Sequence, residues 1–517
     1  MRRKLLENMH LLEISMGWRL SKGSLTARCL RAAGWILSAY VATASYSLAQ
    51  LDKTPDKTPG KTLGEPTIRL PEGSEQITTG KVTGTISFLA SDELAGRETN
   101  SKEFEIAAAY VAARFRGAGL EGGGPEGSFY HETVVGQSRV PSDAVLLQGD
   151  KTPIAHYGLL STDDKACKVQ GRVMDVSLDA LAGPDADLKG LGGILRGEFQ
   201  TQAKGSRAIG QLNRLAQKLQ AAGVQALLLE CESDSEWIKQ AELARSKPKL
   251  DRGDRAGIPI LLIPSKVRIG GDAELTASGL IRDDKRMRNV IGLLRGSDET
   301  LQKQAILYSA HLDHLGSNPA LVDDQVYNGA DDDASGVTAV LTLADAIGAM
   351  KERPKRSVLF MAFWGEESGL LGSKQFVSNP SWPLDQIVAN INIEMIGRPE
   401  GGARGKIWMT GWRESDLGVL MSQAAKPWGV EIFEHPKFSS MLYRSSDNWS
   451  FVERGVIAHS FSAGSLHPDY HQVDDEWDRL EIPHMTQVIQ GLWLGSLPLL
   501  DGTQTPSKAT SSTKESK

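Results

Sequence analysis

Residues 305–316, AILYSAHLDHLG, join an apolar β-type run to a polar turn that carries histidine and aspartate. The same kind of join recurs downstream in SVLFMAFWGEESG (357–369), IVANINIEMIG (387–397) and VIAHSFSAG (456–464). Amphipathic helical patterns such as GVTAVLTLADAIGAM (336–350) separate the apolar runs. Strands that alternate with helices in this way predict a three-layer α/β/α domain around a mostly parallel mixed sheet.

The pattern divides the folded part of the chain into a host domain and an insert. Helical spacing in EFEIAAAYVAARFRGAGL (103–120) favours helices from Ile77 to about Glu132, and we assign 76–140 and 285–500 to the α/β/α domain. Residues 141–284 alternate short apolar strands with glycine-rich turns and contain one helical stretch. They predict an inserted, small, β-rich α/β module.

The two ends of the chain have a different composition. Residues 1–31 are basic, and the apolar stretch that follows ends in Ser47-Leu48-Ala49, which is typical of a signal peptide over 1–49. This predicts export to the periplasm or outside the cell. The alternative is an uncleaved membrane anchor, because about 18 apolar residues are just long enough to span a bilayer. Residues 50–75 are expected to be a linker and 501–517 a disordered tail.

Charge and cysteine content narrow the classes of function. The chain has a formal net charge of −6, and removal of the basic residues 1–49 would make the remainder more acidic. We therefore expect no nucleic-acid partner, because phosphate binding requires a basic surface. Cys167 and Cys231 could form one disulfide in an oxidising compartment or stay free, but two thiols are too few for a disulfide framework.

The polar turns carry metal-type side chains. His311 and Asp313 share a face of an extended segment, so Asp313 can hold the imidazole in the tautomer that leaves one nitrogen free for a metal. An isolated His-x-Asp would more often be a surface pair, but here it ends a strand at a glycine turn. The run Asp331–Asp333 could simply cap a helix. Because adjacent anions repel one another, a bound cation would explain an inward carboxylate, and we assign that place to Asp332.

Two further turns supply carboxylates and a late histidine. Glu366 and Glu367 follow an apolar strand and point in different directions, so one can bind a metal while the other takes the proton of a metal-bound water. Glu394 also directly follows a strand. His471 lies in HPDYHQVDD, where loop hydrogen bonding or packing against Tyr470 and Trp477 would by itself be a more ordinary role than metal binding.

Taken together, these segments resemble the two-zinc exopeptidases of metallopeptidase family 28. The resemblance rests on eight ordered segments within residues 77–480, namely LASDELAGR, RNVIGLLRGSD, SAHLDHLG, YNGADDDASG, FWGEESGLLGS, NIEMIGR, SSDNWSFVERGV and HPDYHQVDD. It implies a secreted aminopeptidase that hydrolyses N-terminal residues from peptides through a metal-bridging water. The insert is similar to the protease-associated domain common in this family.

The resemblance also implies a role for each site residue. One zinc ion would be held by His311 and Glu394 and the other by Glu367 and His471, with Asp332 bridging the two Zn²⁺ ions. Glu366 would be the general base. Tyr470 would donate a hydrogen bond to the developing oxyanion.

Two positions depart from the family pattern, which usually has Asp where Glu394 stands and often His where Asn448 stands. The longer side chain of Glu394 is expected to change the affinity for the second metal ion and the substrate pocket more than the class of reaction. The alternatives are a glutaminyl cyclase-like enzyme with one zinc ion, a carboxypeptidase-type member of the same fold, and a non-catalytic binding protein on this scaffold. A membrane partner is expected only if the N-terminal segment is uncleaved.

Overall fold

The computed structural model describes residues 70–184, 186–203, 205–250, 257–319, 321–402, 404–464 and 466–509. The segment predicted as a signal peptide and most of the predicted linker lie outside this part of the chain. Within it, no helix combines the length and the apolar character needed to cross a bilayer.

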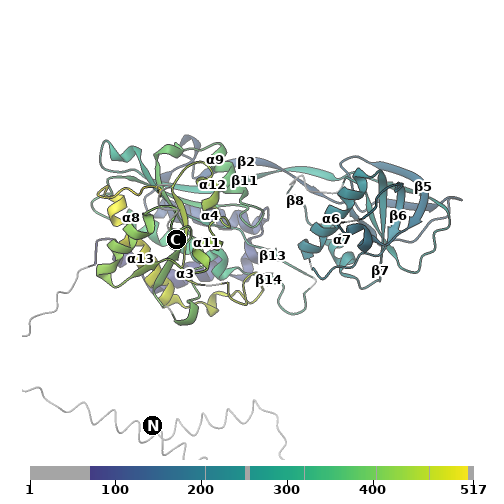
Figure 1. Cartoon of the computed structure of the whole chain (residues 1–517). Helices are drawn as coiled ribbons and strands as arrows, with labels where there is room; N and C mark the ends of the chain where they lie inside the picture. Colours follow the sequence, from purple (N-terminus) through teal and green to yellow (C-terminus); the bar gives the residue numbers. More distant parts are fainter. Residues whose placement is uncertain are drawn as a thin grey trace, which may run out of the picture. The chain divides into compact units, whose positions relative to one another are not determined.

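A large mixed sheet forms the centre of the host domain and confirms the predicted α/β/α architecture (Figure 1). Its central strands β12, β15, β16 and β19 run parallel. Strand β11 is antiparallel to its neighbours β15 and β2, and β17 is antiparallel to β19 but parallel to β18. In spatial order the strands are β18 (Glu431–Phe433), β17 (Lys406–Met409), β19 (Ala458–Ser462), β16 (Ile387–Ile393), β12 (Ala305–His311), β15 (Ser357–Phe363), β11 (Ile281–Leu294), β2 (Tyr130–Arg139) and β8 (Lys249–Leu250), and β1 (Glu121–Gly122) also pairs with β11.

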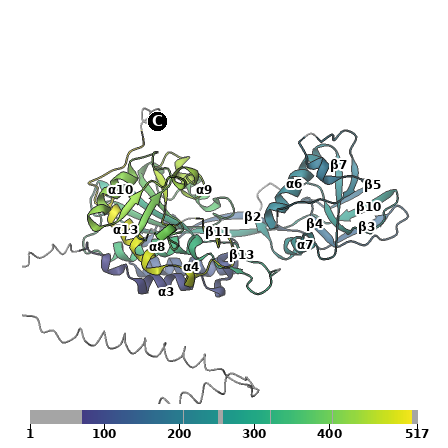
Figure 2. The same cartoon turned by 60° about the horizontal axis from the view of Figure 1, so that its bottom comes forward.

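Helices cover both faces of this sheet because both faces are apolar. Along β12, Ile306, Tyr308 and Ala310 pack into one core and Ala305 and Leu307 into another. Figure 2 shows the helices of the first face together. These are α3 (Thr79–Leu89), α4 (Lys102–Gly117), α8 (Ser335–Gly348), α10 (Leu417–Ala425) and α13 (Ile482–Leu500), and the opposite core contains residues of α9 (Leu371–Ser378) and α12 (Asn448–Val452).

The helical expectation for the N-terminal part extends too far. Helix α4 ends at Gly117, and β2 begins at Tyr130. The β-branched residues Thr133, Val134 and Val135 favour an extended strand, and β2 pairs with β11 along its whole length. The chain leaves the host sheet after β2 and returns to it through β11.

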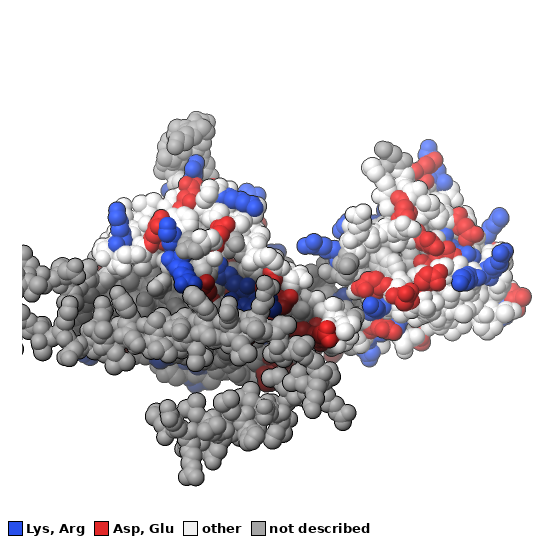
Figure 3. Space-filling view, turned by 90° about the horizontal axis from the view of Figure 1, so that it is seen from below, with Lys and Arg blue, Asp and Glu red and all other residues white. Residues whose placement is uncertain are grey.

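A second sheet spans residues 144–277 and defines the inserted module. Its two faces have separate apolar cores, and helix α6 (Gly205–Ala221) contributes to one of them. Acidic and basic side chains are intermingled over this module on the face shown in Figure 3. The strands are, in spatial order, β3 (Ala144–Gln148), β10 (Asp272–Ala277), β5 (Cys167–Asp175), β6 (Gly193–Gly197), β7 (Val224–Cys231), β9 (Ile260–Pro264) and β4 (Gly158–Ser161). The module also contains α5 (Leu178–Ala182) and α7 (Glu236–Ser246).

The structure answers two expectations from the sequence, one about the two cysteines and one about the C-terminal tail. Among the described residues, Cys167 and Cys231 form no disulfide. The tail expected to be disordered from Asp501 instead packs against the host domain up to Lys508, which forms a β-bridge with Ser415. The reason is the buried Arg356, whose guanidinium donates to Gln504 O at 2.8 Å and thereby ties the tail down.

Candidate metal centre

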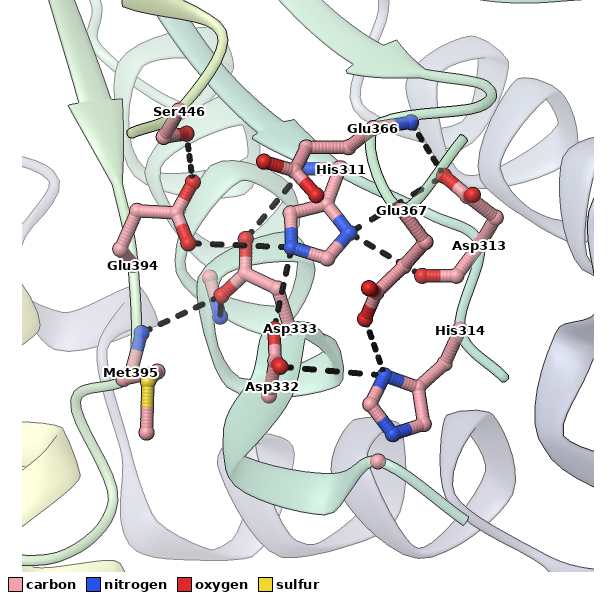
Figure 4. Close-up of polar contacts among 12 residues, drawn as sticks. His311, Asp313, His314, Asp332, Asp333, Glu366, Glu367, Glu394, Met395 and Ser446 are labelled. Carbon is pink, nitrogen blue, oxygen red and sulfur yellow. Dashed lines mark hydrogen bonds and ion pairs between the residues drawn. The ribbon is translucent and has the colours of Figure 1, made fainter. Parts of the chain in front are cut away.

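The carboxyl ends of the parallel strands bring the predicted site residues together. His311 is the last residue of β12, Glu366 and Glu367 follow β15, and Glu394 follows β16. Because these strands run in the same direction, their ends meet at one edge of the sheet. Figure 4 shows the side chains converging there from separate strands.

A first group of metal-type donors consists of His311, Asp332 and Glu394. His311 Nε2 lies 3.1 Å from Asp332 Oδ1 and 3.7 Å from Glu394 Oε2. Donors bound to one tetrahedral zinc ion at 2.0–2.2 Å would lie about 3.3 Å apart, so these separations suit a shared ion.

A second group lies on the other side of Asp332. His471 Nε2 is 3.0 Å from Asp332 Oδ2 and 3.3 Å from Glu367 Oε1. The two carboxylate oxygens of Asp332 thus face different donor groups. Glu367 Oε1 is buried and accepts no hydrogen bond from the described residues, so a bound cation would satisfy it. Nitrogen and carboxylate donors of this kind suit zinc.

The three adjacent aspartates have separate contacts, although all are buried. Asp331 accepts a hydrogen bond from Gly397 N at 2.6 Å. Asp333 accepts from Gly336 N in the first turn of α8 at 3.0 Å and from His311 N at 3.2 Å. Only Asp332 faces the histidines of both donor groups.

Two residues that the sequence did not single out hold this loop in place. Asp475 accepts hydrogen bonds from Asp331 N at 3.1 Å and Asp332 N at 3.2 Å. Arg97 is buried and donates to Asn328 O at 2.7 Å and Gly329 O at 2.9 Å, just before the aspartates. Burial lowers the pKa of Arg97 to about 10, against the raising effect of nearby aspartates, so the guanidinium stays charged at neutral pH.

Asp313 supports His311 in a different way from the one expected. His311 Nδ1 is 3.0 Å from the backbone oxygen of Asp313 and 4.0 Å from its carboxylate oxygen Oδ1. The backbone oxygen therefore accepts the Nδ1 hydrogen, which leaves Nε2 free. The carboxylate instead accepts from Thr99 Oγ1 and from Glu366 N, the latter at 3.1 Å. Asp313 thus fixes the loop that carries Glu366.

The pKa values of the adjacent residues Glu366 and Glu367 are shifted in opposite directions. Burial raises the pKa of Glu366 well above its usual value; His311 opposes this effect, whereas Asp447 and Glu394 add to it. Burial and Asp332 also act to raise the pKa of Glu367, but its contacts with His314 and His471 outweigh them and lower it to about 2. Glu367 is the ionised member of the pair at neutral pH, and Glu366 is the one suited to carry a proton.

A pocket with about 660 Å³ of empty space, its open mouth included, lies beside the first donor group. His311, Glu366 and Glu394 form part of its wall, and apolar side chains including Trp408 and Phe438 form another part. Tyr470 also lines the pocket, with its ring stacked on that of His471 at a centroid distance of 3.9 Å.

The two positions that depart from the family pattern lie in different settings. Glu394 accepts hydrogen bonds from Ser446 Oγ and from Asn392 Nδ2, the latter at 3.0 Å, so its longer side chain is held towards His311. Asn448 donates to Tyr443 O and accepts from Ser460 Oγ, both at 3.0 Å. The amide of Asn448 is therefore used in packing the surrounding loops, outside both donor groups.

Residues 289–494 match the profile of peptidase family M28. This region belongs to that family. The M28 region contains both donor groups and Glu366, whereas Arg97 and Thr99 precede it.

Individual relatives agree with this assignment. Aminopeptidase YwaD of Bacillus subtilis (strain 168) is 25% identical over 315 residues, which cover 56% of this chain and 61% of YwaD. The chain thus spans about three fifths of that relative. A probable zinc metalloprotease of Pyrenophora teres f. teres is 36% identical over 108 residues, which are 21% of this chain and 22% of that protein. The solved structure of BSAP, a zinc aminopeptidase from Bacillus subtilis, has the same fold, with a TM-score of 0.51 at 19% identity over 87% of this chain and 98% of that one.

Proposed function

We propose that this protein is a zinc-dependent aminopeptidase that holds two zinc ions and removes N-terminal residues from peptides. The observation that carries the proposal is the position of Asp332, whose two carboxylate oxygens face separate groups of nitrogen and oxygen donors. The aminopeptidases YwaD and BSAP among its relatives support the choice of reaction. His311 and Glu394 would hold one ion, Glu367 and His471 the other, and Asp332 both.

The residues around the donors suit peptide hydrolysis. Zinc, when bound, polarises a carbonyl group and makes a bound water more acidic. Glu366 would take the proton of the attacking water and return it to the leaving amine, for which its raised pKa is favourable. The Tyr470 hydroxyl would donate a hydrogen bond to the carbonyl oxygen as negative charge develops on it. Both side chains line the same pocket.

The proposal also covers the export of the protein and the type of its inserted module, which do not affect the reaction. The composition of residues 1–49 supports the proposal of export to the periplasm or the medium, and the inserted module would be of the protease-associated type. A peptide is the partner that the proposed reaction requires.

The decisive experiment combines a substrate panel with a zinc count on the same sample of full-length protein. Aminoacyl reporters and reporters with a free C-terminus would be compared at equal concentration, and bound zinc would be measured by elemental analysis. We expect hydrolysis of the aminoacyl reporters and two zinc ions per chain. Cleavage of only the C-terminal reporters would make the protein a carboxypeptidase. One zinc ion with cyclisation of N-terminal glutamine would make it a glutaminyl cyclase, and no turnover at all would leave a binding protein.

A further inference from the structure

A third histidine lies at the metal centre and has no part in the ligand set described above. His314 is fully buried, and its Nδ1 lies 2.9 Å from Glu367 Oε1 and 3.9 Å from Asp332 Oδ2 (Figure 4). His314, Asp332 and Glu367 form a donor group of their own. Its ring meets that of His471 edge-on at a centroid distance of 5.6 Å.

The polar atoms of His314 lack partners. Within the part of the chain that the structure describes, neither Nδ1 nor Nε2 makes a hydrogen bond, and Glu367 Oε1, the atom that Nδ1 faces, makes none either. The two atoms are close, but their directions do not suit a hydrogen bond. Leaving buried polar atoms unsatisfied is costly, and a cation placed between them would satisfy both at once.

The separations around Glu367 and Asp332 fit one ion with four protein donors. Glu367 Oε1 and Asp332 Oδ2 lie 2.9 and 3.9 Å from His314 Nδ1, and 3.3 and 3.0 Å from His471 Nε2. Donors around a tetrahedral zinc ion would lie about 3.3 Å apart. These four separations scatter around that value, so His314 and His471 are placed as two corners of the same coordination sphere.

We propose that His314 Nδ1 is a ligand of the second zinc ion, alongside Asp332, Glu367 and His471. This inference rests on the proposed function, because it presupposes the two-zinc centre. It makes the two sites unequal. The first site has three protein donors, which line the pocket together with Glu366, whereas His314, Glu367 and His471 do not line it.

This inequality gives the two ions different roles. Zinc sites closed by four protein ligands are typically structural, and catalytic sites keep a position open for water or substrate. The second ion is therefore held permanently, and the first is the one that exchanges with solution and meets the substrate. A chelator removes the first ion before the second.

The first test uses wild-type protein loaded with two zinc ions and needs no substrate. Zinc X-ray absorption counts imidazole ligands: His311, His314 and His471 shared by two ions give an average of about 1.5 per zinc, whereas a set without His314 gives about 1.0. An average near 1.0 overturns the inference and leaves the proposed aminopeptidase intact. An average near 1.5 in a protein that cleaves no peptide supports the ligand and overturns the function.

The second test measures zinc affinity by competition with a chelator in variants of the full chain. His314→Ala is expected to weaken the tighter site at least about 100-fold, because loss of an outer-shell partner alone costs about 10- to 100-fold. His471→Ala is the positive control. His131→Ala is the matched negative control, since His131 is equally buried but binds Gln375 and Asn379 away from the centre.

A third variant separates a ligand from a hydrogen-bonding side chain. His314→Gln keeps a donor that can reach Glu367 but supplies no imidazole nitrogen. We expect it to lose zinc as His314→Ala does. Wild-type affinity in His314→Gln would assign His314 to holding Glu367 by a hydrogen bond and would overturn its role as a ligand.

Discussion

The neighbouring residues Glu366 and Glu367 illustrate how environment divides roles between identical side chains. Glu367 has a pKa of about 2, because the two histidines that it contacts outweigh burial and Asp332, whereas burial holds the pKa of Glu366 well above its usual value. Titratable groups whose pKa values are driven apart at one site mark the assignment of acid and base. The structure thus supports Glu366 as the proton carrier on physical grounds separate from sequence resemblance.

The first prediction concerns Glu366. Glu366→Gln removes the base but none of the proposed ligands, so kcat should fall by on the order of 10² to 10⁴ while zinc content stays unchanged. Steady-state kinetics and elemental analysis of the same preparation measure both. A variant that keeps more than half of the wild-type kcat would rule out Glu366 as the base.

The second prediction concerns Glu394, which departs from the usual aspartate of the family pattern. Glu394→Ala should bind about one zinc ion instead of two and lose most activity, because the first donor group loses one of its three members. Glu394→Asp is the matched control: it keeps a carboxylate and should keep two ions, with weaker affinity because the shorter side chain gives up the bonds from Ser446 and Asn392. If Glu394→Ala binds two ions and stays fully active, the site must be rebuilt around another carboxylate, with Asp447 the first to test.

At the scale of elements, Arg97 connects the N-terminal helices to two loops of the M28 region. Its guanidinium donates to Leu89 O at the end of α3, to Leu312 O beside His311, and to the backbone just before the aspartates. A single charged group thereby fixes the spacing of two segments that each supply proposed ligands. Hydrogen bonds from charged donors each contribute about 1.5–3 kcal/mol.

The third prediction follows from that connection. Arg97→Met should lower both the Tm and the affinity for zinc, since it leaves buried carbonyl groups unpaired and frees both loops. Arg356→Met is the control, because Arg356 is another buried arginine that donates to backbone oxygens, but far from the centre at the C-terminal tail. It should lower Tm without changing zinc affinity. Equal zinc affinities in the two variants would mean that Arg97 serves the fold alone.

The elements of the host sheet were predictable, because each central strand is an apolar run that ends in a polar turn. His311 and Glu394 could be picked out for the same local reason. Asp475 could not: nothing in the sequence distinguishes it from Asp474, yet Asp474 is an exposed partner of Arg479 and Asp475 is buried beneath the aspartate loop. Roles of this kind depend on contacts made 144 residues away along the chain.

Long-range contacts also explain why two expectations from the sequence, the role of the Asp313 carboxylate and the disorder of the tail after Asp501, differ from the structure. Asp313 is two residues from His311 in the sequence, but its carboxylate accepts hydrogen bonds from Thr99 and Glu366, which come from distant segments. Residues 501–509 have the composition of a mobile tail, and contacts with distant residues such as Arg356 and Asp416 make them pack. The composition of a segment indicates whether it would be ordered by itself, but not whether a distant segment binds it.

At the scale of the whole molecule, the proposed zinc ions would join segments from most of the length of the M28 region. Their donors lie at or just after the ends of three strands and in two loops, from His311 to His471. Without a cation, the buried carboxylates at this point repel one another, and burial raises the pKa of Glu394 as well as that of Glu366. Metal binding should therefore stabilise the native state and not the unfolded chain.

The fourth prediction is a dependence of Tm on free zinc. A ligand at 100 times its Kd stabilises the native state by about 2.7 kcal/mol, so thermal scans of chelator-treated protein should show Tm rising as zinc is restored. Magnesium at the same concentration is the control, because it prefers six oxygen ligands. Asp332→Ala, which loses the shared ligand, should respond little to zinc. If Asp331→Ala loses the response and Asp332→Ala keeps it, the shared ligand is Asp331.

The inserted module begins and ends on paired strands, because Arg139 of β2 lies opposite Ile281 of β11. For the host sheet, the whole insertion is therefore a loop whose two ends are already adjacent. The entropy of closing a loop grows only with the logarithm of its length, so that each doubling costs about 0.6 kcal/mol. An insertion of this size, with its own apolar cores, adds little to the folding cost of the host. Evolution can accordingly lengthen, replace or remove the module between β2 and β11 while the strands that carry the metal centre keep their register.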